Sequence, residues 1–395
     1  MSKLSIAVVG AGIGGLTAAL ALARQGHTVT LVERRTGFSE VGAGLQLSPN
    51  ASRILIKLGL GPALRRVATE PERVVVRAIC SGKRIGAVAL GAFMRERFDA
   101  PYWVVHRADL QTILLDAVRS EPSIRLVMGR TVESVEDSAS QASLTWISAG
   151  GAQETLTADV IVGADGVWSK VRQQLGARRP PAYRGYIAWR ATFERNAAPA
   201  ELAGEETGLW LGSQGHVVHY PIAGGRLINV VAIEKNPTPV EGWAAPGQRE
   251  DLLARYASAA PTLRDLLARP QEWLRWSLFD HPTKRLANGR IALLGDAAHP
   301  VLPFLAQGAA MAIEEAATLA SLLRDPHADI PQLLSAYEKQ RLGRAIRVQK
   351  EARTNGRIYH AGYLVAFGRD RVMRHLGPEG MTKRYDWLYG FRTPD

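Results

Sequence analysis

The chain of 395 residues has little of what marks several protein classes. Its single cysteine, Cys80, excludes an internal disulfide framework and a cysteine-rich zinc site. Aromatic residues make up 7%, charged residues 22% and hydrophobic residues 46%, which are ordinary values for a globular protein. Disordered, collagen-like and coiled-coil classes are therefore excluded. The scarcity of cysteine favours a reducing, cytoplasmic location.

Long hydrophobic runs are also scarce, and only residues 4–23 approach the length of a membrane span. This segment could pass for a signal peptide, but four glycines interrupt its middle. Glycines at these positions suit a turn between a strand and a helix. We therefore expect neither export nor a membrane partner.

Acidic residues are fewer than basic ones: the chain has 37 acidic and 49 basic residues, which gives a net charge of +12. The basic residues are scattered, with no run of five or more, so we expect no nucleic-acid partner. A positive field can instead concentrate small anionic substrates.

The order of predicted elements indicates the fold class. Residues 4–32 contain a strand, a glycine-rich turn, a helix and a second strand, which predicts a βαβ unit with a parallel sheet. Residues 185–234 hold short β-rich runs joined by tight turns, which predicts an inserted antiparallel sheet. We expect an α/β fold: a Rossmann-like domain with a mixed sheet, an inserted antiparallel β-sheet domain and C-terminal helices.

The turn after the first strand carries a dinucleotide-binding pattern. Gly10 permits a tight turn, Gly12 lets a pyrophosphate approach the backbone, and Gly15 lets helix and strand pack closely. The phosphates would lie at the N-terminus of the helix, where free N–H groups favour anions. Glu33 follows at the distance expected for a residue that binds ribose, which favours FAD or NAD over NADP.

Two further turns follow buried strands. Asp165 opens an Asp-Gly turn after residues 159–164, and Asp296 completes a Gly-Asp turn after residues 290–294. Together with the glycine pattern, and in this order, they resemble the motifs of the class A flavoprotein monooxygenases. This is the family of aromatic hydroxylases that includes 4-hydroxybenzoate hydroxylase. The resemblance covers essentially the whole chain.

The resemblance implies FAD bound non-covalently, with NADH or NADPH as a transient co-substrate. Asp296 would hold a ribitol hydroxyl, and Asp165 lies in a motif associated with both FAD and the pyridine nucleotide. Arg107 and Gln111 would contact the flavin chain. Pro300 would lie beside the isoalloxazine ring, towards which a helix beginning at 307–308 would direct its dipole. The residues expected to bind FAD are Gly10, Gly12, Gly14, Gly15, Glu33, Arg34, Arg107, Gln111, Asp165, Asp296, Pro300 and Gly308.

Within the family, the chain is similar to hydroxylases for salicylate, 3-hydroxybenzoate and 6-hydroxynicotinate. The segments that carry this similarity are residues 42–50, 215–221 and 298–308. His216 and Tyr220 share one face of the expected strand, with His219 on the other face as a structural or surface residue. The resemblance places His216 and Tyr220 at the substrate ring as catalytic residues. A histidine there suits removal of a phenol proton.

The chain also departs from these relatives. Hydroxynicotinate hydroxylases carry histidines where this chain has Gln46 and Phe304, which argues against a pyridine and for a benzoate-type ring. Gln46, Phe304 and Gln307 are therefore candidates for the substrate pocket. Arg190, on a neighbouring strand, could pair with a substrate carboxylate or lie at the surface.

The resemblance thus implies an enzyme that hydroxylates a small phenolic acid, of the salicylate or 3-hydroxybenzoate type, with NAD(P)H and O2 through a flavin C4a-hydroperoxide. No metal is needed, and a homodimer is possible for this family. A flavin epoxidase or oxidase of a larger lipid, quinone or quinolone, and a non-catalytic flavin sensor, stay open. The expected parts are 1–72, 101–180 and 286–330 for FAD binding, 73–100 and 181–285 for the substrate, and a C-terminal helical region at 331–395.

Overall fold

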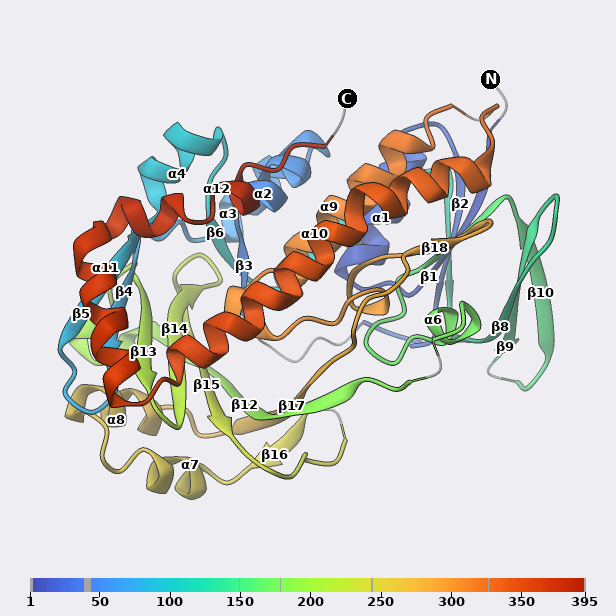
Figure 1. Ribbon diagram of the computed structural model, residues 1–395. Coiled ribbons are helices and arrows are strands. Elements are labelled where there is room, and N and C mark those ends of the chain that lie inside the picture. Colours follow the sequence, from blue (N-terminus) through green and yellow to red (C-terminus); the bar gives the residue numbers. More distant parts are fainter. Residues whose placement is uncertain are drawn as a thin grey trace.

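A computed structural model describes residues 3–38, 44–148, 150–177, 179–242, 244–325 and 327–393. Figure 1 shows two sheet-based parts, with the long helix α10 (Ile330–Tyr359) running from one to the other. Within the described ranges, no helix is long and apolar enough to cross a membrane.

The first part is built on a largely parallel sheet. From one edge to the other its described strands are β18 (Ala287–Asn288), β19 (Ile291–Leu293), β11 (Val160–Gly163), β1 (Ser5–Val9), β2 (Thr28–Glu33) and β7 (Ile124–Met128). Only the β18–β19 pairing is antiparallel. Parallel strands are covered on both faces and need continuous apolar runs, and β11 is accordingly buried along its whole length.

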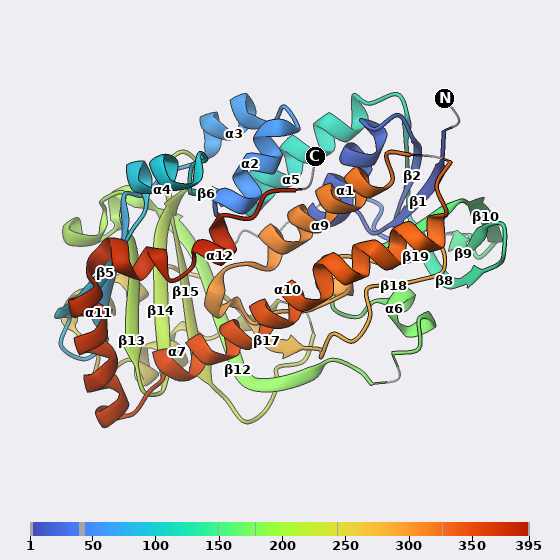
Figure 2. The ribbon, with the colours of Figure 1, turned by 45° about the horizontal axis from the view of Figure 1, so that its top comes forward.

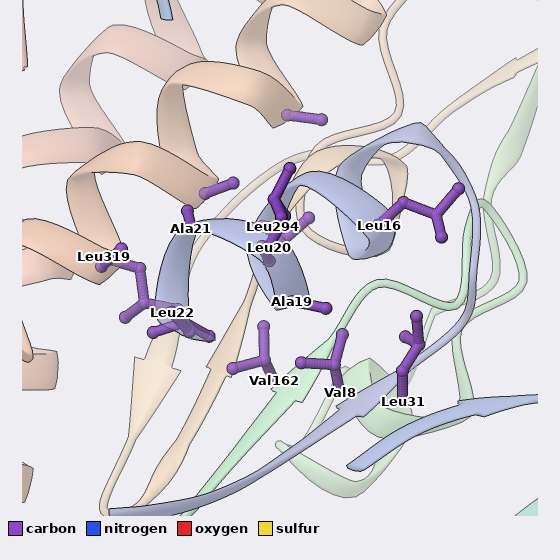
Figure 3. Packing of buried hydrophobic residues seen from close by; sticks show 14 of the residues in the cluster. Val8, Leu16, Ala19, Leu20, Ala21, Leu22, Leu31, Val162, Leu294 and Leu319 are labelled. Atoms are coloured by element: carbon purple, nitrogen blue, oxygen red, sulfur yellow. The ribbon is translucent and has the colours of Figure 1, made fainter. Parts of the chain in front are cut away.

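Helix α1 (Ile13–Ala23) covers one face of this sheet and is itself covered by α9 (Gly308–Leu322). Figure 3 shows leucines of α1 among branched side chains of the strands, such as Val8. The helices approach closely, since a Cβ atom on Gly14 would lie 3.0 Å from the Cβ atom of Ala312 in α9. A helix enclosed on both sides explains the apolar run near the start of the sequence.

The second part is a large, mostly antiparallel sheet. Its described strands are, in order, β16 (Ala245–Gly247), β17 (Trp273–Asp280), β12 (Ala182–Glu194), β15 (Leu227–Lys235), β14 (Gly215–Ile222), β13 (Thr207–Gly212), β4 (Arg73–Ala78) and β5 (Arg84–Ala89). The hairpin of β4 and β5 joins through a parallel pairing of β4 with β13. Segments that precede and follow the Asp165 turn in the sequence thus share one sheet.

Smaller elements connect these parts. A ribbon of β3 (Gly44–Leu47) and β6 (Trp103–His106) lies next to β14, and β8 (Arg130–Asp137), β9 (Ala142–Ser148) and β10 (Gln153–Ala158) form a small antiparallel sheet. The remaining α-helices in the first three quarters of the described chain are α2 (Pro49–Lys57), α3 (Gly61–Val67), α4 (Gly91–Phe98), α5 (Arg107–Arg119), α6 (Lys170–Gln174), α7 (Arg249–Arg255) and α8 (Pro261–Ala268).

The C-terminal helices pack against both parts. Helix α11 (Tyr363–Lys383), which bends at Gly377, lies along β5, and the short α12 (Asp386–Tyr389) lies near α2. Figure 2 shows this path, in which the chain returns across the molecule after α10. The predicted α/β class with an antiparallel sheet and C-terminal helices is confirmed.

Candidate functional site

The glycine turn between β1 and α1 is tight on one side and open on the other. Gly10 has φ +100°, and a Cβ atom there would lie 2.5 Å from the Ala164 carbonyl oxygen. A Cβ atom on Gly15 would lie 1.8 Å from the Gly10 oxygen, whereas one on Gly12 would meet nothing within 4 Å. Gly10 and Gly15 therefore form the turn, and Gly12 leaves open space beside the first N–H groups of α1. This cradle fits a pyrophosphate.

Glu33 ends β2 and is buried beside the same turn. Its Oε2 accepts a hydrogen bond from the Ala11 N–H at 2.8 Å, and its Oε1 accepts from the backbone N–H of Arg35 at 3.0 Å. The Gln111 amide donates to the Ala11 carbonyl at 3.4 Å. Glu33 and Gln111 therefore both hold the turn, while Arg34 is exposed beside them. A carboxylate can accept further hydrogen bonds, so these contacts are compatible with ribose at Glu33.

The carboxylate of Asp165 is engaged within its own turn. It accepts hydrogen bonds from the Ser169 hydroxyl at 2.5 Å and from the backbone N–H groups of Lys170 at 2.7 Å and Val171 at 3.2 Å. Burial raises its pKa, although these bonds oppose the shift. The side chain therefore organises the start of α6, and its contact with FAD stays a prediction.

Asp296 lies in a 3-10 turn, Gly295–Ala297, just after β19. Its side chain is exposed, and its carboxylate makes no hydrogen bond to any residue that the structure describes. The surrounding protein still desolvates it enough to raise its pKa, against the opposing charges of His299 and Arg107. An accessible but closely surrounded acceptor fits a hydroxyl donor such as the ribitol chain of FAD.

The segment after Asp296 is fixed by a buried pair. His299 Nε2 lies 2.5 Å from Oε1 of Glu315, whose Oε2 accepts from the Gly295 N–H at 2.8 Å. Burial lowers the pKa of His299, but Glu315 raises it further, so the net shift is upward. The pair holds the turn that carries Asp296 and Pro300 against α9.

The structure gives Gln307 a different role from the predicted substrate contact. It precedes α9, and its buried amide donates to the Ser48 hydroxyl at 2.9 Å and accepts from the Asn50 amide at 3.1 Å. Both ends of its side chain are therefore occupied. The first turn of α9 contains no acidic side chain, so its free N–H groups near Gly308 suit an electron-rich ring.

The hydrogen bonds of Gln307 and Asn50 continue into a buried charged network, which the sequence motifs did not indicate. Glu314, fully buried in α9, accepts from Asn50 at 2.6 Å, from Arg341 at 2.6 Å and from Arg344 Nε at 2.7 Å. Burial opposes ionisation of Glu314, but the two arginines lower its pKa overall. Arg344 also donates to the Trp387 and Leu388 carbonyls, each at 2.8 Å. The start of α9 is thereby tied to α10 and to the C-terminal segment.

One end of the predicted substrate pocket is polar. The Tyr102 hydroxyl donates to Oε1 of Gln46, and Gln46 lies close enough to Tyr220 to oppose the rise in the pKa of that phenol. The Tyr220 ring packs directly on β3, where a Cβ atom on Gly44 would lie 2.4 Å from it. Burial raises the pKa of Tyr220 and of Tyr102, so both phenols are neutral near pH 7. Tyr102 was missed because nothing in its local sequence marks it.

Arg190 of β12 lies on the same face of the sheet. Its register partner Val231 also pairs with Val218, which lies between His216 and Tyr220 on β14. The Arg190 guanidinium stacks 5.0 Å from the centre of the Trp276 ring, and its Nε atom is buried without a hydrogen bond. Burial lowers the pKa of Arg190 to about 10, and Arg107 adds to the effect. No carboxylate pairs with it among the described residues.

The other end of the predicted pocket is aromatic. His216 is buried, and its Nδ1 atom lies 2.8 Å from Nε2 of His360, the residue after α10. The Phe304 ring lies 5.5 Å from the His216 ring, and the Tyr359 ring lies 5.3 Å from it. Burial lowers the pKa of His216 well below its usual value, and His360 adds to this. Tyr359 and His360 come from the C-terminal helices and were not predicted.

His219 lies on the opposite face of β14, as predicted, but it is buried and not at the surface. It packs against Trp210, and neither ring nitrogen has a hydrogen-bond partner in the described structure. Burial lowers the pKa of His219 to about 4, and Arg77 adds to the shift. It belongs to the core behind the sheet and plays no part in the candidate site.

Comparison with known proteins identifies the family. The sequence profile of a FAD binding domain matches residues 3–352. The chain belongs to this family of FAD-binding proteins. It is 33% identical to a 3-hydroxybenzoate 6-hydroxylase of Polaromonas naphthalenivorans (strain CJ2), over 99% of the chain and 97% of the relative. It is 36% identical to the 3-amino-4-hydroxybenzoate 2-monooxygenase PtnB3 of Streptomyces platensis, over 98% and 96%.

Solved structures agree with this assignment. A salicylate hydroxylase in a substrate complex matches with a TM-score of 0.84 and 27% identity, over 99% of this chain and 96% of that one. Klebsiella pneumoniae HpxO, crystallised with FAD and uric acid, matches with a TM-score of 0.85 and 27% identity, over 98% and 96%. The predicted resemblance to class A flavoprotein monooxygenases is confirmed, and so is FAD as the cofactor. The chain is a FAD-dependent monooxygenase.

Proposed function

We propose that this monooxygenase hydroxylates a small aromatic acid that carries both a phenol and a carboxylate, with NADH or NADPH as reductant. The observation that carries the proposal is Arg190, a partly buried cation whose Nε atom is fully buried and which lacks a carboxylate partner among the described residues. An unpaired charge that is partly removed from water is unfavourable, so a ligand that supplies the opposite charge is favoured. Tyr220 and Gln46 lie beside it and can donate hydrogen bonds to the same carboxylate.

The spacing of the side chains along β14 supports a substrate ring with its carboxylate at the Tyr220 end and its hydroxyl at the His216 end. His216 and Tyr220 are four residues apart on one face, which is about 13 Å between their backbones. Val218 lies between them and offers an apolar floor, beside which Arg190 enters from β12. A ring with its carboxylate near Arg190 and Tyr220 would direct its hydroxyl towards His216.

Bound FAD would supply the activated oxygen atom, after reduction by NAD(P)H. Its pyrophosphate would lie at the turn of Gly10 and Gly12, its ribitol at Asp296, and its ring at the N-terminus of α9, beside Pro300. The protein has three tasks. It orients the ring through Arg190, excludes water with aromatic walls, and accepts the phenol proton at Nε2 of His216.

The relatives support a carboxylated phenol. Two of the curated relatives are named for 3-hydroxybenzoate and 3-amino-4-hydroxybenzoate, and one structural neighbour is a salicylate hydroxylase. Each of these printed names includes a ring with both groups. HpxO, with uric acid, differs in this respect, and urate therefore belongs in any substrate screen.

The experiment is a screen of FAD-loaded protein for NADH and NADPH oxidation, with products identified by mass spectrometry. The rings are salicylate, 3-hydroxybenzoate, 4-hydroxybenzoate, 3-amino-4-hydroxybenzoate, 6-hydroxynicotinate and urate. Matched controls are 3-methylphenol, which lacks the carboxylate, and benzoate, which lacks the hydroxyl. We expect an oxygen atom added to one hydroxybenzoate and to neither control.

Other outcomes would refute the proposal. Equal turnover of 3-methylphenol and 3-hydroxybenzoate would mean that the carboxylate is not recognised. Turnover of urate alone would move the substrate class to purines. Tight FAD binding without stimulated turnover would favour the epoxidase, oxidase or sensor alternatives. A cytoplasmic location, close to the NAD(P)H pool, and a homodimer stay predictions.

A further inference from the structure

Two buried histidines from distant parts of the chain form a pair beside the proposed position of the phenol. His216 lies on β14, and His360 follows the last residue of α10, with 2.8 Å between Nδ1 of the first and Nε2 of the second. Their side chains are almost fully enclosed, with exposed fractions of 2% and 6%. Figures 1 and 2 show how α10 brings its C-terminal end against the large sheet.

We infer that His360 is a positioning residue that fixes the proton-accepting tautomer of His216 and receives the phenol proton through it. This inference rests on the proposed function, in which His216 meets the substrate hydroxyl. It adds a partner that the sequence motifs did not indicate, since the two residues are 144 positions apart.

The hydrogen bond fixes which nitrogen of His216 faces the substrate. A neutral imidazole has one N–H donor and one acceptor nitrogen. In the described structure Nδ1 of His216 is hydrogen-bonded to His360, whereas Nε2 has no hydrogen-bond partner and is not fully buried. When Nδ1–H donates to His360, the lone pair is on Nε2, which is the atom that can accept a proton. Without His360 the ring is free to adopt the other tautomer.

The proton transfer is balanced within the pair. The substrate O–H bond breaks as an Nε2–H bond forms on His216. The Nδ1–H bond of His216 breaks as an Nε2–H bond forms on His360. His360 keeps its Nδ1 proton and becomes the imidazolium, while the substrate becomes the phenolate. The site gains no net charge, and the same steps reverse when the product takes a proton back.

The surroundings keep both rings neutral until a substrate arrives. The titratable groups that face the pair are Tyr359 from α10, Tyr186 from β12 and Lys235 from β15, and none of them is a carboxylate. Burial lowers the pKa of His360 to about 4, and Lys235 adds to the shift. A phenolate beside the pair is the negative charge that would favour its protonation.

The first test needs no substrate. Nitrogen-15 NMR of the histidine rings in FAD-loaded protein reports the tautomer of His216. We expect a neutral ring with its proton on Nδ1 in the wild type. His360→Gln, whose amide oxygen can still accept the hydrogen bond, should retain this tautomer, and His360→Phe should lose it. A wild-type His216 with its proton on Nε2, or an unchanged tautomer in His360→Phe, would overturn the inference for any substrate.

The second test separates proton transfer from positioning. In single turnovers with 3-hydroxybenzoate we expect both His360 variants to slow hydroxylation by about 10- to 100-fold, and flavin reduction by less than twofold. The deficit of His360→Gln should shrink as the pH rises, because the phenol then ionises unaided. Equal losses in both steps, or a deficit that does not change with pH, would contradict the proton-accepting role.

A matched control is His219→Gln, which removes a buried histidine from the other face of the same strand. It should leave the ratio of the two rates unchanged. If wild-type protein hydroxylates none of the tested rings, the proposed function fails. The NMR result then still decides whether His360 sets the tautomer of His216.

Discussion

Replacement of Arg190 by methionine isolates the charge on which the proposed substrate class depends. Methionine keeps an unbranched stem against Trp276 and removes the guanidinium, which lies 5.0 Å from that ring. In the free protein no carboxylate partner is lost, because none is paired with Arg190 in the described structure. In the proposed complex the substrate carboxylate loses the cation expected to pair with it. Removing one member of a buried charged pair costs about 2–5 kcal/mol.

Taking about 3 kcal/mol, the dissociation constant for 3-hydroxybenzoate should rise about 100-fold. Titration of the flavin absorbance with 3-hydroxybenzoate and with 3-methylphenol measures this directly. Affinity for 3-methylphenol, which has no carboxylate, should change by less than about threefold, and Arg190→Lys should retain part of the preference for the acid. The melting temperature of Arg190→Met should not fall, since the native protein gives up no ion pair. Equal losses of affinity for both ligands, or a clearly lower melting temperature, would show that Arg190 supports the fold and not the substrate.

Three further predictions concern single residues. Asp296→Ala should weaken FAD binding, because the ribitol loses its acceptor, and a purified variant that stays fully yellow through gel filtration would refute the assignment. Gly12→Ala should fold normally, since its Cβ atom meets no protein atom, but should bind FAD more weakly because that atom would occupy the space expected for the pyrophosphate. Gly10→Ala has φ +100° and a contact of 2.5 Å with the Ala164 carbonyl oxygen, so its free energy of unfolding in denaturant melts should fall by about 1–3 kcal/mol. His219, with a pKa lowered to about 4, stays neutral in the folded protein while the unfolded chain takes up a proton below about pH 6.5, so stability falls as the pH drops between these values. His219→Gln should therefore remove up to about 3 kcal/mol of acid sensitivity between pH 6.5 and pH 4, and parallel stability curves for variant and wild type would contradict this.

The cofactor side of the molecule could be predicted because its signals are local. Gly10, Gly12 and Gly15 act within one turn, and Glu33 reaches that turn from the next strand. Asp165 shows the limit of such patterns. Ser169, the N-cap of α6, follows four residues later and donates to its carboxylate, a local arrangement that the motif alone did not indicate. The carboxylate of Asp296 has no such hydrogen-bond donor among the neighbouring residues that the structure describes.

The substrate side could be predicted only in part. Alternation along β14 placed His216 and Tyr220 on one face and His219 on the other, because successive side chains of a strand point to opposite faces of the sheet. What lies opposite that face depends on contacts between distant segments. Gln307 became a candidate for the pocket through the family resemblance, but the hydrogen-bond partners of its amide lie 257 and 259 residues away. No local pattern records such a pairing.

Helix α10 brings Tyr359 and His360 to the proposed substrate site, and the register of the helix decides which residues lie there. Its 30 residues span about 45 Å, from the FAD part to the large sheet. At the far end a Cβ atom on Gly356 would lie 2.6 Å from the Phe304 ring, and Asn355 donates to the Phe304 carbonyl at 3.3 Å. One added residue would turn the helix end by about 100°, which would remove His360 from His216 and press a side chain onto Phe304. The length of α10 therefore constrains the proposed position of the substrate hydroxyl as strictly as the strand residues do, although most of the helix lies elsewhere.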